Sequence, residues 1–172
     1  MINWIGNVFN ELFFISGVYN MKIFFICWLS WLVAQIIKVI INAVKILYHK
    51  SKGEKYKKIT VGTFFKLGGM PSSHTATVIS LCTCIALRNG FHSDIFAVAG
   101  VFAFITMFDA RMVRLPVGRL TDAFNRLQAK VCGDETVDVK KVEGHTIPEI
   151  VGGFIVGFTI AFIMVNVVGF LN

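Results

Sequence analysis

Residues 150–171 read IVGGFIVGFTIAFIMVNVVGFL and carry no charged side chain. An α-helix needs about 20 consecutive, mainly apolar residues to cross the hydrocarbon core of a bilayer. This run meets that requirement and predicts a transmembrane helix. The composition agrees, because 55% of the 172 residues are hydrophobic and only 16% are charged, whereas soluble domains carry roughly 25% charged residues.

Three further apolar segments precede this run, and together they predict an all-α, polytopic membrane helix bundle of about four transmembrane helices. The second and third segments are too short to cross a bilayer unless protein covers their polar ends. Lysines inside the first segment, Lys38 and Lys45, need a partner or must reach the interface. We treat residues 1–172 as a single integral membrane domain with spans at residues 23–48, 71–88, 94–110 and 148–171.

Two other segments have the pattern of amphipathic helices. In residues 1–20, apolar side chains recur at helical spacing from Ile2 to Leu12, which predicts a helix lying in the membrane interface, with a short fifth span as the alternative. Residues 115–131 show the same spacing, and Pro116 suits the first turn of a helix. This second segment is expected to be a cytosolic amphipathic helix.

Basic residues predict which way the bundle faces. Thirteen of the 17 lysines and arginines lie in the loops that follow the first and third spans, whereas the opposite side offers only Lys22 and Arg88. Lys and Arg accumulate in the cytoplasmic loops of membrane proteins. We therefore expect a multi-pass protein whose two long loops, and the polar clusters at their ends, face the cytosol.

The first polar cluster is residues 66–74, KLGGMPSSH, where the second span begins. A helix N-terminus presents unpaired N–H groups and a partial positive charge, so it favours an anion. A simpler interpretation is that one serine caps the helix while the histidine lies at the interface. We assign a phosphate-binding role to Lys66, Gly69, Ser72 and Ser73, and a proton-donating role to His74.

The second cluster is residues 109–114, DARMVR. Asp109 ends an apolar run, where an ionisable group is costly unless it is paired. Arg111 and Arg114 carry guanidinium forks that bind phosphate oxygens bidentately, although arginines at this depth can also meet lipid headgroups. We assign all three to phosphate binding, Asp109 mainly by orienting an arginine. Lys38 would find its partner at such an anionic site.

The third cluster is residues 144–149, GHTIPE, before the last span. His145 and Glu149 are four residues apart and share one face if the segment is helical. A carboxylate beside an imidazole fixes its tautomer and raises its nucleophilicity. Thr146 can instead be an N-cap with Glu149 at the third helical position, a capping box that needs no catalysis. The two roles are compatible.

These clusters resemble the motifs of the superfamily of type-2 phosphatidic acid phosphatases and vanadium haloperoxidases. The string GGMPSSH at residues 68–74 is similar to its Pro-Ser-Gly-His motif, and His145-x3-Glu149 is similar to its His-x3-Asp. Lys38-x6-Lys45 has the spacing of the Lys-x6-Arg-Pro motif, without its arginine and proline. The likeness to the divergent, compact branch is closer, through these strings together with Ala34-Gln35-x2-Lys38, Asp109-Ala110-x2-Val113-Arg114, Asn125 and residues 144–149.

The resemblance implies a membrane phosphatase that hydrolyses a lipid phosphate or diphosphate through a phosphohistidine. In it His145 attacks phosphorus, Glu149 orients His145 and His74 protonates the leaving oxygen, with no metal or other cofactor required. The expected partners are a lipid phosphate or phosphate anion and membrane lipids, with no nucleic acid; a homodimer is compatible with so small a bundle. One departure concerns the arginine six residues before the nucleophile, which falls on Val139, so Lys140, Lys141 or, better, Arg111 or Arg114 must replace it.

Two alternatives belong to other functional classes. The altered first motif and the replaced arginine favour a non-catalytic protein that binds anionic lipid or phosphate, as a scaffold or a lipid-moving protein. A metal-dependent site is the third reading, with Asp109, Glu149 and the histidines as ligands. The effect of His145→Ala separates the first two, since it abolishes turnover in an enzyme and only weakens headgroup binding.

Overall fold

The computed structural model describes residues 19–52, 69–131, 137 and 139–169. The expected interfacial helix at residues 1–20 lies outside this part of the chain, apart from its last two residues, which begin the first described helix. Lys66 also lies outside it.

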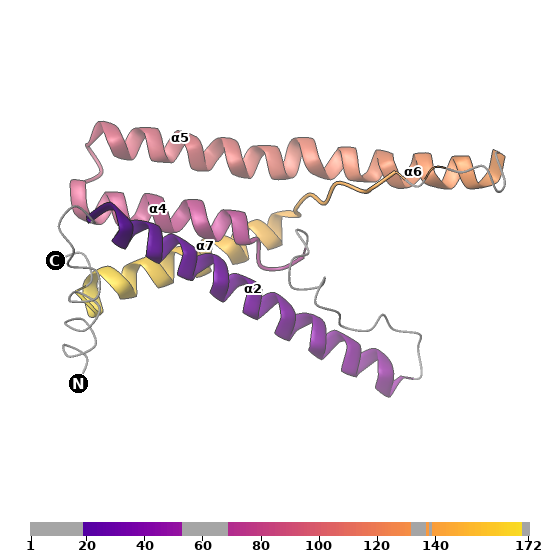
Figure 1. The fold of residues 1–172 in the computed structure, drawn as a ribbon, viewed down its shortest axis with the longest axis horizontal. Helices are drawn as coiled ribbons and strands as arrows, with labels where there is room; N and C mark the ends of the chain where they lie inside the picture. The colour runs from indigo at the N-terminus through magenta and orange to yellow at the C-terminus, as the bar shows by residue number, and fades with distance from the viewer. Residues whose placement is uncertain (1–18, 53–68, 132–136, 138, 170–172) are drawn as a thin grey trace.

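Every regular element in the described ranges is helical, which confirms the predicted all-α membrane bundle (Figure 1). Three helical stretches are long and apolar enough to cross a membrane: Met21–Ser51, Asp94–Val131 and Ile147–Val167. The elements are α2 (Tyr19–Ser51), α4 (Ser73–Asn89), α5 (Asp94–Phe108), the π-helical turn η1 (Asp109–Arg114), α6 (Leu115–Val131), α7 (Ile147–Phe162) and a second π-helical turn, η2 (Ile163–Val167).

Helix α4 is the centre of the bundle, because α2, α5 and α7 all pack against it. It is also rich in hydroxyl side chains, most of them buried. Several bond within the helix: the Oγ1 of Thr77 donates to the carbonyl of Ser73 at 2.9 Å, and the Oγ of Ser80 donates to the carbonyl of Thr77 at 2.8 Å. Internal bonding and cover by three neighbours explain how this polar segment is accommodated in an apolar bundle.

Close approach of α4 and α7 depends on small residues. Gly153, Gly157 and Ala161 recur every four residues along α7, and all three are buried. A Cβ on Gly157 would overlap the backbone of Ala76, and one on Gly153 would overlap the carbonyl oxygen of Ser72. Small residues at this spacing let two helix backbones touch, which is how helices associate in membranes without a hydrophobic driving force between them.

We expect Gly157→Ala to destabilise the bundle by about 1–3 kcal/mol, because the added methyl group forces α7 away from α4. Gly152→Ala is the matched control: a Cβ there meets the flexible end of Met70 at 3.2 Å. Thermal unfolding of both variants in the same detergent measures the difference. Equal midpoints for the two variants would show that the α4–α7 contact does not limit stability.

The sequence analysis separates a span at 94–110 from an amphipathic helix at 115–131, but the structure joins them. Helix α5 continues through η1 into α6, forming one helical stretch of 38 residues. The missing N–H of Pro116 removes one α-helical hydrogen bond, and the chain remains helical by widening into the π turn just before it. At 1.5 Å per residue this stretch is about 57 Å long, against about 30 Å of hydrocarbon core.

Helices α2 and α6 both extend beyond the rest of the bundle at the same end, as Figure 1 shows. The extending part of α2 carries Lys45 and Lys50, and Lys52 directly follows its end; all three are exposed, and α6 carries Arg119 and Arg126. Exposure of Lys45 agrees with a side chain that reaches the interface. The described parts of the three polar clusters, residues 69–74, 109–114 and 144–149, lie close together where these two extensions begin.

Candidate functional site

The centre of the site is His145, which lies just before α7 with its side chain almost fully buried. Its Nδ1 is 3.3 Å from Oε2 of Glu149, one helical turn further on. The same carboxylate oxygen accepts a hydrogen bond from the backbone N–H of Thr146 at 2.9 Å. One oxygen of Glu149 therefore caps α7 and also contacts the imidazole, while its catalytic role stays a prediction. This contact engages Nδ1 and leaves Nε2 as the ring nitrogen of His145 that does not face Glu149.

The backbone of His145 is fixed by η1. Its N–H donates to the carbonyl of Ala110 at 2.9 Å, and Ala110 is the buried residue of the π turn. The preceding Gly144 runs so close to Leu115 that a Cβ would overlap the Leu115 backbone. Departures from α-helical geometry often mark functional sites, and here the π turn supplies the carbonyl that holds the candidate nucleophile.

The segment that leads to His145 is tied along α6. The side-chain amide of Asn125 donates to the carbonyl of Val139 at 2.9 Å and accepts from its N–H at 3.2 Å. Lys141 forms an ion pair with Asp122 further towards the site. Asn125 was expected only from the family resemblance; in the structure its amide bonds both the carbonyl and the N–H of Val139 and so holds the segment that leads to His145.

His74 reaches the same place from α4. The centroids of the His74 and His145 rings are 6.3 Å apart, so an atom placed between them can contact both. The backbone N–H of Ser72 donates to the carbonyl of Glu149 at 2.9 Å, which joins the start of α4 to the start of α7. A small cavity of about 30 Å³ lies at this junction, lined by both histidines, Thr106, Asp109, Ala110, Arg114 and Glu143.

Of the two predicted arginines, Arg114 lines this cavity, and Arg111 is not among the residues that form it. The Nε of Arg114 is 2.5 Å from Oδ2 of Asp109, and both side chains remain more than a third exposed. Exposed ion pairs contribute little stability, about 0–1 kcal/mol. The pair can therefore open to let the guanidinium meet an incoming anion. The role expected for Asp109, orienting an arginine, matches this geometry.

Lys38 is the largest fully buried side chain of the described residues. Its ammonium lies within the electrostatic influence of Glu143 and Glu149, and Gly69 adjoins the aliphatic part of its side chain. A buried lysine in an apolar helix requires such carboxylates nearby. Glu143 was not singled out in the sequence, although it directly precedes the Gly144–His145 string; it now stands as a further charged group of the site.

The two serines lie at the N-terminus of α4 and are both buried. Ser72 is the N-cap: its Oγ accepts from the N–H of Thr75 at 3.3 Å and from the Thr75 hydroxyl at 3.0 Å. Its capping role, the simpler interpretation, is thus present. The Oγ of Ser73 has no hydrogen-bond partner among the described residues, and a buried hydroxyl in this state favours binding a polar group.

Burial lowers the pKa of the His145 imidazole below its ordinary value, and the hydrogen bond and negative charge of Glu149 act in the opposite direction. Burial has the larger effect because a low-dielectric environment disfavours the charged imidazolium. The ring is therefore neutral at pH 7, with a free lone pair on one nitrogen. This is the protonation state that a nucleophilic or basic histidine needs.

Within the described ranges, no three or more His, Cys, Asp or Glu side chains are spaced as ligands of a metal ion. The groups that do converge are a neutral imidazole held by a carboxylate, a second imidazole, an arginine and a buried lysine. Cations and helix N-termini recognise phosphate oxygens, and the imidazoles can transfer a phosphoryl group and a proton.

The fold and the site together define a helical membrane bundle with a buried histidine–carboxylate pair beside a small cavity lined by both histidines and Arg114. The sequence profile of the divergent PAP2 family matches residues 19–160. The chain therefore belongs to the divergent PAP2 family, as its motifs had indicated.

Part of the chain is also similar to a bacterial membrane protein. The uncharacterized membrane protein YuiD of Bacillus subtilis (strain 168) is 52% identical over 60 residues, which cover 35% of this chain and 38% of that protein. The chain thus aligns with well under half of the length of this relative. No solved structure matches the chain significantly. The family and this relative agree with a PAP2-like membrane protein.

Proposed function

We propose that this protein is a lipid phosphate phosphatase that acts through a phosphohistidine at His145. The observation that carries the proposal is the joint position of the buried His145–Glu149 pair, at 3.3 Å, and the His74 ring, 6.3 Å from that of His145. A nucleophile with an orienting carboxylate and a separate acid is the arrangement that covalent phosphoryl transfer needs.

The first step forms one bond and breaks another. The Nε2 of His145 attacks phosphorus, the P–O bond to the leaving group breaks, and His74 gives its proton to the leaving oxygen. In the second step a water attacks phosphorus, His74 takes a proton from it, and the N–P bond to His145 breaks. Inorganic phosphate leaves, both histidines regain their starting states, and Glu149 stabilises the positive imidazole formed on the way.

Charge on the transferred group is balanced by Arg114, Lys38 and the start of α4. Arg114 is the cation at the cavity that replaces the superfamily arginine missing at Val139. Its release from Asp109 lets it bind the equatorial oxygens bidentately. Stabilising charge that develops in the transition state is usually the largest contribution to such catalysis.

The proposal includes an orientation. α2, α4, α5 and α7 cross the membrane, and the basic extensions of α2 and α6 face the cytosol, as the positive-inside rule requires. The site lies at the base of those extensions, so it opens at the cytosolic interface. A lipid can then place its phosphate at His145 while its hydrocarbon chain stays in the bilayer.

The direct test is to trap the intermediate. Purified protein is mixed with a radiolabelled lipid phosphate, quenched in alkali because the N–P bond is labile in acid, and digested for mass spectrometry. We expect phosphate on His145. A variant that hydrolyses the phosphohistidine slowly should carry phosphate on a larger fraction of its molecules. Turnover without label on any histidine would contradict the covalent mechanism.

The pH profile gives an independent prediction. Burial lowers the pKa of His145, so the acidic fall in kcat/KM should lie below the ordinary histidine pKa of about 6.5. His74 must carry its proton in the first step, so its deprotonation gives a separate fall in kcat/KM on the alkaline side. Glu149→Gln keeps a side chain able to cap α7 but removes the negative charge that raises this pKa. In that variant the acidic fall in activity should move to still lower pH, while the rate also falls.

Because both proteins share one substrate, its own ionisation cancels in the comparison. If the pH at which kcat/KM falls on the acidic side is unchanged or higher in Glu149→Gln, His145 is not the group whose protonation causes that fall.

Two observations favour the non-catalytic alternative. Arg114 is paired with Asp109 and the cavity is small, which suits a site that grips a headgroup without turnover. The trapping experiment separates the two functions, since a binder yields no labelled histidine.

A further inference from the structure

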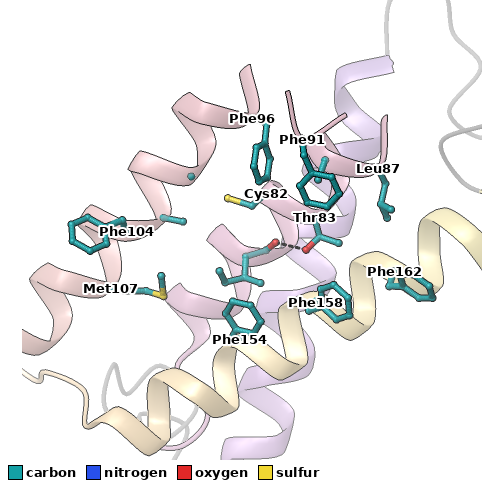
Figure 2. A pocket seen from close by; sticks show the side chains of 14 residues that line it. Cys82, Thr83, Leu87, Phe91, Phe96, Phe104, Met107, Phe154, Phe158 and Phe162 are labelled. Atoms are coloured by element: carbon teal, nitrogen blue, oxygen red, sulfur yellow. Dashed lines mark hydrogen bonds between the residues drawn. The ribbon is translucent and has the colours of Figure 1, made fainter. Parts of the chain in front are cut away.

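A long apolar groove lies beside the site. Helix α4 forms its floor, and α5 and α7 form its walls, as Figure 2 shows. It exists because α5 packs extensively on α4 but makes no comparable contact with α7. The groove has a volume of about 480 Å³. Phe104 and Met107 of α5 face Phe154 and Phe158 of α7 across it.

The lining offers almost no polar group. Thr83 is the one hydroxyl residue in it, and its Oγ1 donates to the carbonyl of Ile79 at 2.8 Å, the dashed line in Figure 2. That hydroxyl is therefore already satisfied. The other lining residues are aliphatic, aromatic, glycine or sulfur-containing. A groove of this kind favours a hydrocarbon occupant and disfavours a polar one.

One end of the groove lies next to the polar site. Met107 lines the groove and the preceding residue, Thr106, lines the cavity with the histidines. On α4, Ile79 follows His74 by five residues, and on α7, Phe154 follows Glu149 by five residues. At 1.5 Å per residue both groove residues lie about 7.5 Å along their helices from the site.

We propose that this groove holds a hydrocarbon chain of the lipid whose phosphate binds at His145. The proposal rests on the proposed function and adds where the chain of the substrate lies. It commits to a single linear chain that enters beside Met107 and runs along α4 towards the other end of the bundle.

The length of the groove sets the length of the chain. From Met107 to Phe96 along α5 is 11 residues, or about 16 Å at 1.5 Å per residue. Carbon–carbon bonds of about 1.5 Å at about 111° advance roughly 1.25 Å per carbon, so the groove covers roughly 13 carbons. Phe91 and Phe96, in edge-to-face contact with centroids 5.2 Å apart, lie at its far end.

The first test needs no catalysis. Purified protein in vesicles is irradiated with phosphatidic acid that carries a diazirine either near the carboxyl end or near the methyl end of one chain. We expect the first probe to label residues near Ile79 and Met107, and the second to label residues near Phe91 and Phe96. Labels spread evenly over outward-facing residues such as Val98 would overturn the proposal. So would protomer–protomer cross-links through the groove, which would make it a subunit interface.

The second test fills the groove. Gly100 lines it, and a Cβ there meets no atom within 4 Å, so Gly100→Trp can occupy the groove without disturbing the packing of α4. The matched control is Val101→Trp, at a neighbouring exposed residue outside the groove. We expect Gly100→Trp to raise KM for long-chain lipid phosphates at least tenfold, to leave short-chain phosphate esters unchanged, and to lose the far-end cross-links.

The two proposals fail separately. Ordered cross-links in a protein that releases no phosphate would retain the groove and contradict the phosphatase. Phosphate release with equal KM values for Gly100→Trp and Val101→Trp, and with no ordered labelling, would retain the phosphatase and contradict the groove.

Discussion

Replacing His145 with alanine should reduce phosphate release from a lipid phosphate by more than about 10⁴-fold, since losing a covalent nucleophile removes the reaction path itself. His74→Ala should cost less, about 10²–10⁴-fold, which is the usual contribution of one general acid. The measurement is the initial rate of phosphate release by purified protein in detergent micelles.

His92→Ala is a control for this series. His92 is an exposed histidine in the turn between α4 and α5, at the opposite end of α4 from the site, so the rate should stay at the wild-type level. Circular dichroism and thermal unfolding show that each variant is folded. A folded His145→Ala protein that keeps a tenth or more of the wild-type rate would exclude His145 as the nucleophile.

Arg114→Ala should lower kcat/KM about 10²–10³-fold, because it removes the arginine that lines the cavity beside both histidines and with it the charge that stabilises the transferred group. Arg114→Lys keeps the charge without the bidentate fork, so it should restore only part of the rate.

Two other arginines make this prediction specific. Arg111 is not among the lining residues of the cavity, so Arg111→Ala should have a clearly smaller effect than Arg114→Ala. Arg126, on the extending part of α6, should tolerate alanine without loss of rate. If the Arg111 and Arg114 variants lose activity equally, the cavity is not where phosphate binds.

The apolar runs were sufficient to predict most of the fold. The apolar segments at 71–88 and 94–110 coincide with the helices α4 and α5 within a few residues, although α4 is not among the three described helical stretches that are long and apolar enough to cross a membrane. The close packing of α4 on α7 depends on the small residues Gly153, Gly157 and Ala161. Their spacing is visible in the sequence, but it does not show which helix packs against them.

Sequence spacing alone did not determine which site residues pair. The side chains of His145 and Glu149, four residues apart, meet, but His145 lies just before α7 and not within the helix on which that expectation rested. Asp109 and Arg114 are five apart, a spacing that does not bring side chains together in an α-helix, yet they pair because η1 is a π turn. Spacing therefore could not show which arginine faces the site.

Tertiary contacts account for what else the sequence left open. The carbonyl of Ala110 accepts a hydrogen bond from the backbone N–H of His145. A pattern of side chains in a sequence does not predict such a backbone contact. Glu143 lines the cavity because the segment before His145 is held against α6 by the hydrogen bonds between Asn125 and Val139. The groove was not anticipated either, since it depends on α5 and α7 flanking the same face of α4.

The most direct test of the central claim is phosphate release by the purified wild-type protein from a panel of lipid mono- and diphosphates, with and without EDTA. The account predicts release that survives EDTA and prefers long-chain substrates. Loss of release on chelation would instead support the metal-dependent alternative. No release from any lipid phosphate, by folded protein that still binds vesicles of anionic lipid, would contradict the phosphatase and leave a phosphate-binding membrane protein.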